Sequence, residues 1–126
     1  MRFVVPASLL LVAVIHAFPL VGIVSAAKVA SLYGVTVQDP NLEILLRHRA
    51  ILFGLLAAFL AYAAFRHPLH GLALMAGSTS VFAFLALAFA VGEYNAALSL
   101  VVKVDILATA ALTVAALVHL RSAGEA

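Results

Sequence analysis

Four long apolar stretches occupy most of the 126-residue sequence. Each of them reaches the roughly 20 residues that an α-helix needs to cross the hydrocarbon core of a bilayer. None alternates between apolar and polar residues with a period of two, so transmembrane β-strands are excluded. We therefore predict an all-α fold, an antiparallel bundle of four transmembrane helices in one integral membrane domain. The apolar stretches cover approximately residues 3–26, 45–65, 71–92 and 96–119.

The composition excludes a soluble fold and several kinds of function. Apolar residues make up 67% of the sequence and charged residues 10%, whereas soluble domains carry about 25% charged residues. The net charge of +2 comes from scattered lysines and arginines, so nucleic acid is not an expected partner. Cysteine is absent, which excludes disulfides, thiolate catalysis and cysteine-based metal sites. The lipid bilayer is the expected surrounding.

The first apolar stretch is expected to stay in the membrane as an uncleaved span. Val24, Ser25 and Ala26 resemble a signal-peptide cleavage site. The apolar stretch is nevertheless longer than the roughly 7–15 residues of a signal-peptide core.

The connections between the spans differ in length. Residues 27–40 are predicted to form the only substantial loop, and the other connections are short turns between antiparallel neighbours. Asp39 suits the N-cap position and Pro40 suits the first position of a helix. We therefore predict that the second helix covers residues 40–65 and begins outside the hydrocarbon.

The charged residues are distributed unequally between the two sides of the membrane. Four spans place both ends of the chain on one side, and the bases Arg2, Arg66 and Arg121 and the acid Glu125 lie there. Cytoplasmic loops of membrane proteins carry an excess of lysine and arginine, and Arg47 and Arg49 lie inside a helix rather than in a loop. When these two are not counted, the distribution favours cytoplasmic termini in a bacterial inner membrane. The opposite side receives Lys28, Asp39, Glu43, Arg47, Arg49, Glu93, Lys103 and Asp105.

Asp105 is the acid that most needs a partner. It lies about nine residues into the fourth helix, which corresponds to about 13 Å. A lone aspartate near the bilayer centre costs about 2.5–3.5 kcal/mol, so its side chain should face the bundle. We expect Arg47 to be its partner rather than Arg49, because Arg47 begins a stripe of small residues that permits close helix packing. Glu43 precedes Arg47 by four residues and can pair with it along the helix, while Lys103 is expected to extend to the headgroups.

These residues suggest a polar pocket at one membrane face that binds a small amphiphile such as a quinone or lipid. Arg47, Arg49 and Asp105 would line the pocket, with Glu43 and His48 assisting. One alternative is a structural or accessory membrane subunit whose ion pairs only hold the bundle together. Another is a small proton-coupled transporter, in which a homo-oligomer would complete the path. No catalytic motif is present, and no catalytic residue is assigned.

The histidines carry weaker signals. His16 lies near the middle of the first span, where we expect a hydrogen bond to one of residues 78–80, and a proton relay is the alternative. No other histidine lies at its depth, so haem is not expected. His67, His70 and His119 can gather at the other end of the bundle, where three imidazoles are able to bind zinc or copper. A turn at headgroup level is the simpler interpretation, so no metal site is assigned.

A family resemblance begins at Arg47. The sequence Arg47-His48-Arg49-Ala50 precedes Leu52-Phe53-Gly54, a short turn contains Pro68, the third helix is rich in small residues, and Asp105 supplies an acid in the last helix. Over about residues 40–120, this layout resembles the DoxX-like group of small four-helix membrane proteins, most of them uncharacterised. The resemblance implies the fold more than any activity. Some members of the group are membrane subunits of quinone-linked sulfur oxidation, which implies a quinone or a partner membrane subunit.

Overall fold

The computed structural model describes residue 1 and residues 3–124, and this part of the chain contains helices but no strand. The predictions that involve Arg2 and Glu125 lie outside the described residues. The elements are α1 (Val4–Ala17), the 3₁₀ helix η1 (Phe18–Ile23), α2 (Ala26–Tyr33), α3 (Pro40–Ala64), the 3₁₀ helix η2 (His67–Leu69), α4 (His70–Val91) and α5 (Ala96–Gly124).

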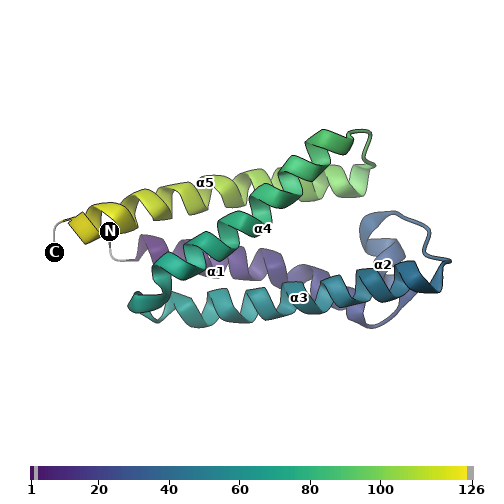
Figure 1. The fold of residues 1–126 in the computed structure, drawn as a ribbon, viewed down its shortest axis with the longest axis horizontal. Coiled ribbons are helices and arrows are strands. Elements are labelled where there is room, and N and C mark those ends of the chain that lie inside the picture. The colour runs from purple at the N-terminus through teal and green to yellow at the C-terminus, as the bar shows by residue number, and fades with distance from the viewer. Residues whose placement is uncertain (2, 125–126) are drawn as a thin grey trace.

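The predicted all-α bundle of four membrane-crossing helices is confirmed. Within the described residues, four helical segments are long and apolar enough to cross a membrane. The two ends of the chain lie at the same end of the bundle (Figure 1), as an even number of spans requires. The chain is therefore a multi-pass membrane protein. The four segments are Val4–Ile23, Pro40–Ala64, His67–Val91 and Ala96–Gly124.

The helices pack closely in one half of the bundle. The fully buried side chains of Leu9, Leu60 and Leu112 lie in this half, which contains the end joined by η2. Small residues allow the helices to approach each other there. At Gly77, for example, an added Cβ would lie 3.5 Å from the side chain of Leu112 and 3.6 Å from that of Leu60.

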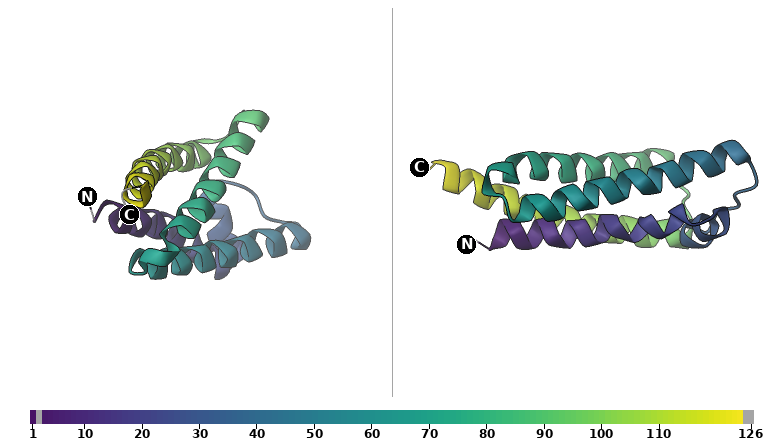
Figure 2. Two further views of the ribbon diagram at one scale, coloured as in Figure 1. Left: turned by 60° about the vertical axis from the view of Figure 1, so that its left-hand side comes forward. Right: turned by 90° about the horizontal axis from the view of Figure 1, so that it is seen from below.

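The other half of the bundle is more open. From η2, α4 runs away from α3, and the two helices diverge toward the end where α2 lies (Figure 1). The left view of Figure 2 shows the same divergence of α4 from α3. The residues that face one another here include Arg49, Phe53, Phe84 and Asp105. Bulky and charged side chains do not allow the close helix contacts that alanine and glycine permit.

The first span is not one continuous α-helix, which corrects the prediction for residues 3–26. The α-helix ends at Ala17, and the chain continues as a 3₁₀ helix over Phe18–Ile23. Pro19 lies at the beginning of this segment. Proline has no N–H to donate to the preceding turn of an α-helix, so the helix is interrupted.

The loop predicted at residues 27–40 contains a short helix, α2. Ser25 caps this helix by accepting a hydrogen bond from the Lys28 N–H at 3.2 Å. Gly34 ends it with a left-handed backbone, at φ 62°. The predicted start of the second long helix is confirmed, because Asp39 Oδ1 accepts from the Asn41 N–H at 2.8 Å and Pro40 is the first helical residue.

Candidate ligand-binding cavity

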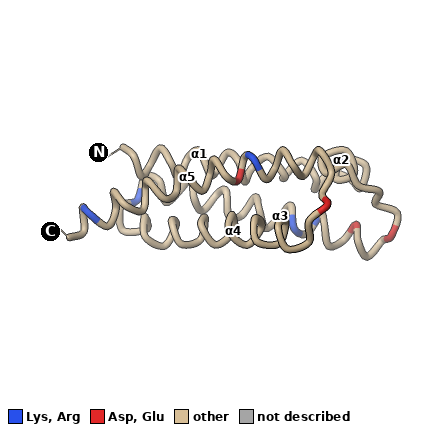
Figure 3. Tube along the Cα trace, turned by 90° about the horizontal axis from the view of Figure 1, so that it is seen from above, with Lys and Arg blue, Asp and Glu red and all other residues tan. Residues whose placement is uncertain are grey.

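The charged residues of the described chain gather in the half of the bundle that contains α2 (Figure 3). Only Arg66, which follows α3, and Arg121, in the last turn of α5, lie near the chain ends. The predicted asymmetry is therefore present among residues 3–124.

Arg47 does not pair with Asp105, and this prediction is wrong. Its Nη1 donates to Glu43 Oε1 at 2.8 Å, and its Nε donates to the Ile23 carbonyl oxygen at 2.9 Å. The pair with Glu43 was expected from the spacing. Ile23 is the last residue of η1, where carbonyl groups lack partners within the helix. Arg47 therefore links α3 to the end of the first span through a hydrogen bond.

Arg47 faces the first span because the small residues that follow it on the same face of α3, Ala50 and Gly54, pack there. At Gly54 an added Cβ would collide with the side chain of Leu20, and at Gly22 it would lie 3.7 Å from Ala50. This stripe of small residues thus packs against η1. The prediction was that it packs against the fourth helix. Small residues permit close packing but do not specify which helix approaches.

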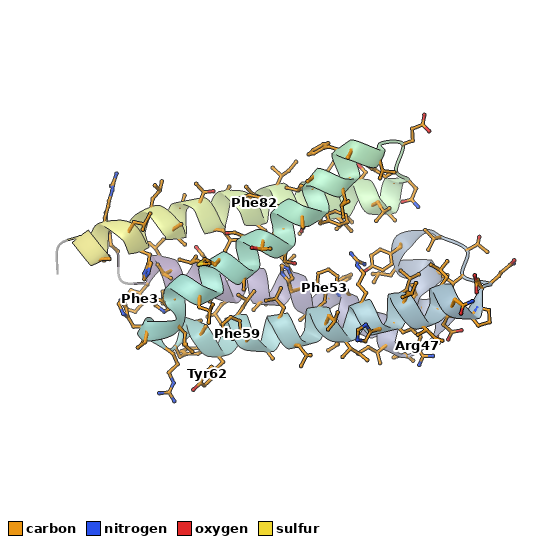
Figure 4. All side chains as sticks on the ribbon, viewed as in Figure 1. Phe3, Arg47, Phe53, Phe59, Tyr62 and Phe82 are labelled. Carbon is orange, nitrogen blue, oxygen red and sulfur yellow. The ribbon has the colours of Figure 1, made fainter. Side chains whose placement is uncertain are left out.

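Arg49 is the arginine that faces the interior. Two residues of helix separate it from Arg47, which corresponds to about 200° around the axis. Its guanidinium carbon lies 4.6 Å from the ring centroid of Phe53 and 5.1 Å from that of Tyr33, within the range of cation–π contacts. Figure 4 shows Phe53 and Arg47 on different sides of α3. Arg49 has no hydrogen-bond partner within the described chain.

Asp105 faces the same interior space from α5. Its side chain is 7% exposed, and its carboxylate has neither a hydrogen bond nor an ion pair among the described residues. Every fully buried side-chain nitrogen or oxygen of the described chain has a hydrogen-bond partner. Because the Asp105 carboxylate oxygens have none, they retain some accessible surface. Arg49 is the arginine in the lining of the same cavity. The neighbouring Lys103 is exposed.

His16 forms a defined hydrogen-bonded unit beside these charges. One ring nitrogen, Nδ1, donates to the Val12 carbonyl oxygen at 2.9 Å. In the neutral imidazole Nε2 is then the acceptor, and the Ser80 hydroxyl donates a hydrogen bond to it at 2.9 Å. The expected bond to one of residues 78–80 is confirmed at Ser80. Among residues 3–124, no chain of hydrogen bonds continues from this unit to Asp105.

These groups surround a cavity of about 400 Å³. Ligand pockets typically measure about 300–1,000 Å³ and combine apolar walls with a few polar groups. The polar groups here are His16, Tyr33, Arg49, Ser80 and Asp105. The walls are otherwise apolar and consist of Val14, Ile15, Phe18, Pro19, Leu32, Phe53, Phe84, Ala97, Leu100, Val101 and Val104. Every helix of the bundle except η2 contributes to this lining.

The residues predicted to form one site are divided between two places. Arg49 and Asp105 line the cavity, whereas Glu43, Arg47 and His48 lie at a separate surface depression beside the beginning of α3. Phe53 was not predicted to line the site, and Ser80 was predicted only as a candidate partner of His16. Tyr33 reaches the cavity because the segment that follows the Ser25 cap is folded as α2.

The three histidines at the other end of the bundle do lie close together. The ring centroids of His67 and His70 are 5.0 Å apart, and that of His119 lies 6.2 and 6.3 Å from them. Among the described residues, no group of three or more His, Cys, Asp or Glu side chains has an arrangement that could hold a metal ion. Nε2 of His70 lies 3.4 Å from the Ala64 carbonyl oxygen.

The fold and the cavity together define a four-helix multi-pass membrane protein with a mostly apolar internal pocket. No protein-family model, curated protein or solved structure matches the chain. The chemistry of the cavity is therefore the basis for assigning a function.

Proposed function

We propose that this protein binds a small amphiphile, such as a quinone or lipid, with its head group between Arg49 and Asp105. The observation that carries this proposal is the state of Asp105, which is 7% exposed, faces a cavity and has no partner in the described chain. A carboxylate in such a position needs a donor. The apolar walls suit the ring or alkyl part of an amphiphile.

A purely structural role for these charges has less support. If Arg49 and Asp105 only held the bundle together, they would be expected to lie in direct contact, because pairing offsets the cost of burial. The described ion pair is instead Arg47 with Glu43, and Arg47 also bonds the Ile23 carbonyl. The attachment of α3 to the first span therefore does not depend on the two charges in the cavity.

A proton-coupled transporter also has less support than a binding protein. Such a path requires polar groups that follow one another across the membrane. Both bonded nitrogens of His16 are committed to Val12 and Ser80, and no hydrogen bond joins this unit to Asp105 within residues 3–124. His16 is better explained as a fixed part of the cavity wall.

The proposal includes a location, a bacterial inner membrane with cytoplasmic termini. Arg47 and Arg49 belong to α3, and one is bound to Glu43 while the other faces the cavity. These contacts support discounting both arginines in the positive-inside rule, and the proposal then takes Arg66 and Arg121 as the bases on the cytoplasmic side. A homo-oligomer or a partner membrane subunit remains a prediction. Membership of the DoxX-like group remains a prediction.

Native mass spectrometry of gently extracted protein tests this function. The wild-type protein should carry an additional small molecule that is released on activation. Val101→Trp should reduce that occupancy at least tenfold, because Val101 lines the cavity and indole would fill part of it. Leu107→Trp is the matched control on the same helix, since Leu107 is 57% exposed and lies outside the cavity. A wild-type protein without ligand, or equal occupancy in Val101→Trp, would refute the proposal.

A further inference from the structure

We infer that the head group bound in this cavity is net neutral and two-ended, with a hydrogen-bond donor for Asp105 and an acceptor for Arg49. This inference rests on the proposed function and specifies its ligand class. Two membrane components have the required chemistry: a hydroquinone, which carries hydroxyl groups, and a zwitterionic aminophospholipid, which carries an ammonium and a phosphate.

The donor is required by the environment of Asp105. An ionised carboxylate only accepts hydrogen bonds. The hydroxyl of Ser80, which also lines the cavity, donates its hydrogen bond to His16 Nε2, and the other His16 nitrogen donates to the Val12 carbonyl oxygen. Neither of these groups therefore offers a donor to Asp105, and the hydroxyl of Tyr33, which also lines the cavity, makes no hydrogen bond with a described residue. Thr109, one turn further along α5, donates to the Asp105 backbone oxygen at 2.9 Å and not to the carboxylate.

The acceptor is required by Arg49. Guanidinium carries five N–H donors and cannot accept a hydrogen bond. The rings of Phe53 and Tyr33 contact the Arg49 guanidinium but are not conventional acceptors. Aromatic contacts hold the plane of a guanidinium and leave its N–H edge available. Arg49 lines the cavity, and its N–H groups have no hydrogen-bond partner among the described residues.

The two charges together select against a head group of a single sign. A fatty acid would satisfy Arg49, but its carboxylate would be repelled by Asp105, and an alkylamine would have the reverse difficulty. Repulsion of this kind is strong in an apolar site, where screening is weak. Lys103 is exposed and does not line the cavity, so it does not alter this balance. A neutral head group with both functions satisfies each charge.

Matched pairs of probes test the inference in detergent, with the full-length protein. Decylhydroquinone is compared with decylquinone, which has acceptors but no hydroxyl donor. Dihexanoyl phosphatidylethanolamine is compared with dihexanoyl phosphatidylcholine, whose quaternary ammonium has no N–H. At least one donor-bearing probe should bind tenfold or more tightly than its partner, and the successful pair identifies the source of the chemistry. Decanoate should bind more weakly than that probe.

Two variants assign these preferences to the two charges. Asp105→Asn should reduce the tenfold preference to less than threefold and should strengthen decanoate binding, because the repelling charge is removed. Arg49→Gln should weaken both members of the successful pair by a similar factor, since both carry acceptors. Lys103→Gln is the control, two residues from Asp105 but outside the cavity, and should leave every affinity within twofold.

The outcomes separate this inference from the proposed function. The inference is wrong if Asp105→Asn retains the preference, or if decanoate binds the wild-type protein as tightly as any other probe. It is also wrong if no probe binds although mass spectrometry detects a ligand that Val101→Trp excludes, and in that case the proposed function still holds. Helical circular dichroism and a single gel-filtration peak confirm that each variant is folded. If Asp105→Asn is not folded, the inference is still wrong when Arg49→Gln leaves the affinity of the successful probe within twofold of the wild-type value, or when decanoate binds the wild-type protein as tightly as that probe.

Discussion

Ser80 of α4 donates its hydroxyl proton to Nε2 of His16 in α1, at a distance of 2.9 Å. This bond joins two helices at the edge of the cavity, and the second bond of His16, to the Val12 carbonyl oxygen, fixes the orientation of the ring. The imidazole is therefore held as an acceptor on the cavity side. His16 thus joins α1 to α4 through hydrogen bonds of its imidazole, and this role does not require the ring to be charged.

Ser80→Ala should destabilise the protein, because His16 Nε2 would lose its donor. Hydrogen bonds between membrane helices contribute about 0.6 kcal/mol on average and at most about 1.7 kcal/mol, so a loss of about 0.5–1.5 kcal/mol is expected. Steric-trap unfolding in bicelles measures the change. The control is Thr79→Ala, at an exposed position of the same helix. Equal stability of Ser80→Ala and wild type would show that the bond contributes nothing.

Arg47→Gln should weaken the attachment of α3 to η1 and should leave the cavity functional. The Ile23 carbonyl loses a charged donor, which typically costs about 1.5–3 kcal/mol. The ligand affinity should stay within twofold, because Arg47 is absent from the cavity lining. Unfolding and binding measurements on the same preparation check both expectations. Glu43→Gln should cost only about 0.3–0.5 kcal/mol, as for other pairs four residues apart on a helix surface. An Arg47→Gln protein that is stable but cannot bind would contradict the separation of the two arginines.

Asn95→Ala should loosen α2. The Asn95 side chain donates to the carbonyl oxygens of Tyr33 and Gly34, at 2.8 and 3.0 Å, and its Oδ1 accepts from the Leu98 N–H at 2.9 Å. These bonds attach the end of α2 to the beginning of α5. Hydrogen exchange in α2 should become about tenfold faster, which corresponds to about 1.4 kcal/mol.

The same variant should also weaken ligand binding, because Tyr33 lines the cavity and contacts Arg49. Glu93→Gln provides the control in the same turn, since Glu93 is exposed. Unchanged exchange in α2 of Asn95→Ala would show that other contacts hold this helix.

Reporter fusions test the proposed orientation. A fluorescent protein that folds only in the cytoplasm should fluoresce when it is fused after residue 126. Alkaline phosphatase, which is active only outside the cytoplasm, should be active when it is inserted in the turn between α4 and α5, at Gly92–Asn95. Arg66→Glu together with Arg121→Glu should reduce both signals, because these bases supply the cytoplasmic charge. The opposite pattern of reporter activity in the wild type would reverse the orientation.

Part of the candidate site could be predicted from residue type and depth alone. Asp105 was expected to face the interior because an aspartate so far into an apolar helix cannot remain among lipid chains. His16 was expected to reach residues 78–80 for a similar reason, and it bonds Ser80. In both cases the cost of an unpartnered polar group leaves few acceptable positions.

The identity of the arginine in the site could not be predicted in this way. Arg47 and Arg49 have the same chemistry and nearly the same depth, and they differ only in direction around the helix axis. That direction depends on which helix covers the stripe of Ala50 and Gly54, and the covering helix is η1. No property of α3 itself selects between η1 and α5.

The sequence by itself determined an all-helical, four-span membrane protein with its charged residues gathered in one half. Apolar length and the need to satisfy every backbone hydrogen bond in lipid decide these features locally. The tertiary structure decided that Arg49 and Asp105 share a cavity, that Arg47 binds the end of η1, and that Tyr33 of α2 reaches the site. These features depend on how the helices rotate and diverge, which is set by contacts between residues far apart in the chain.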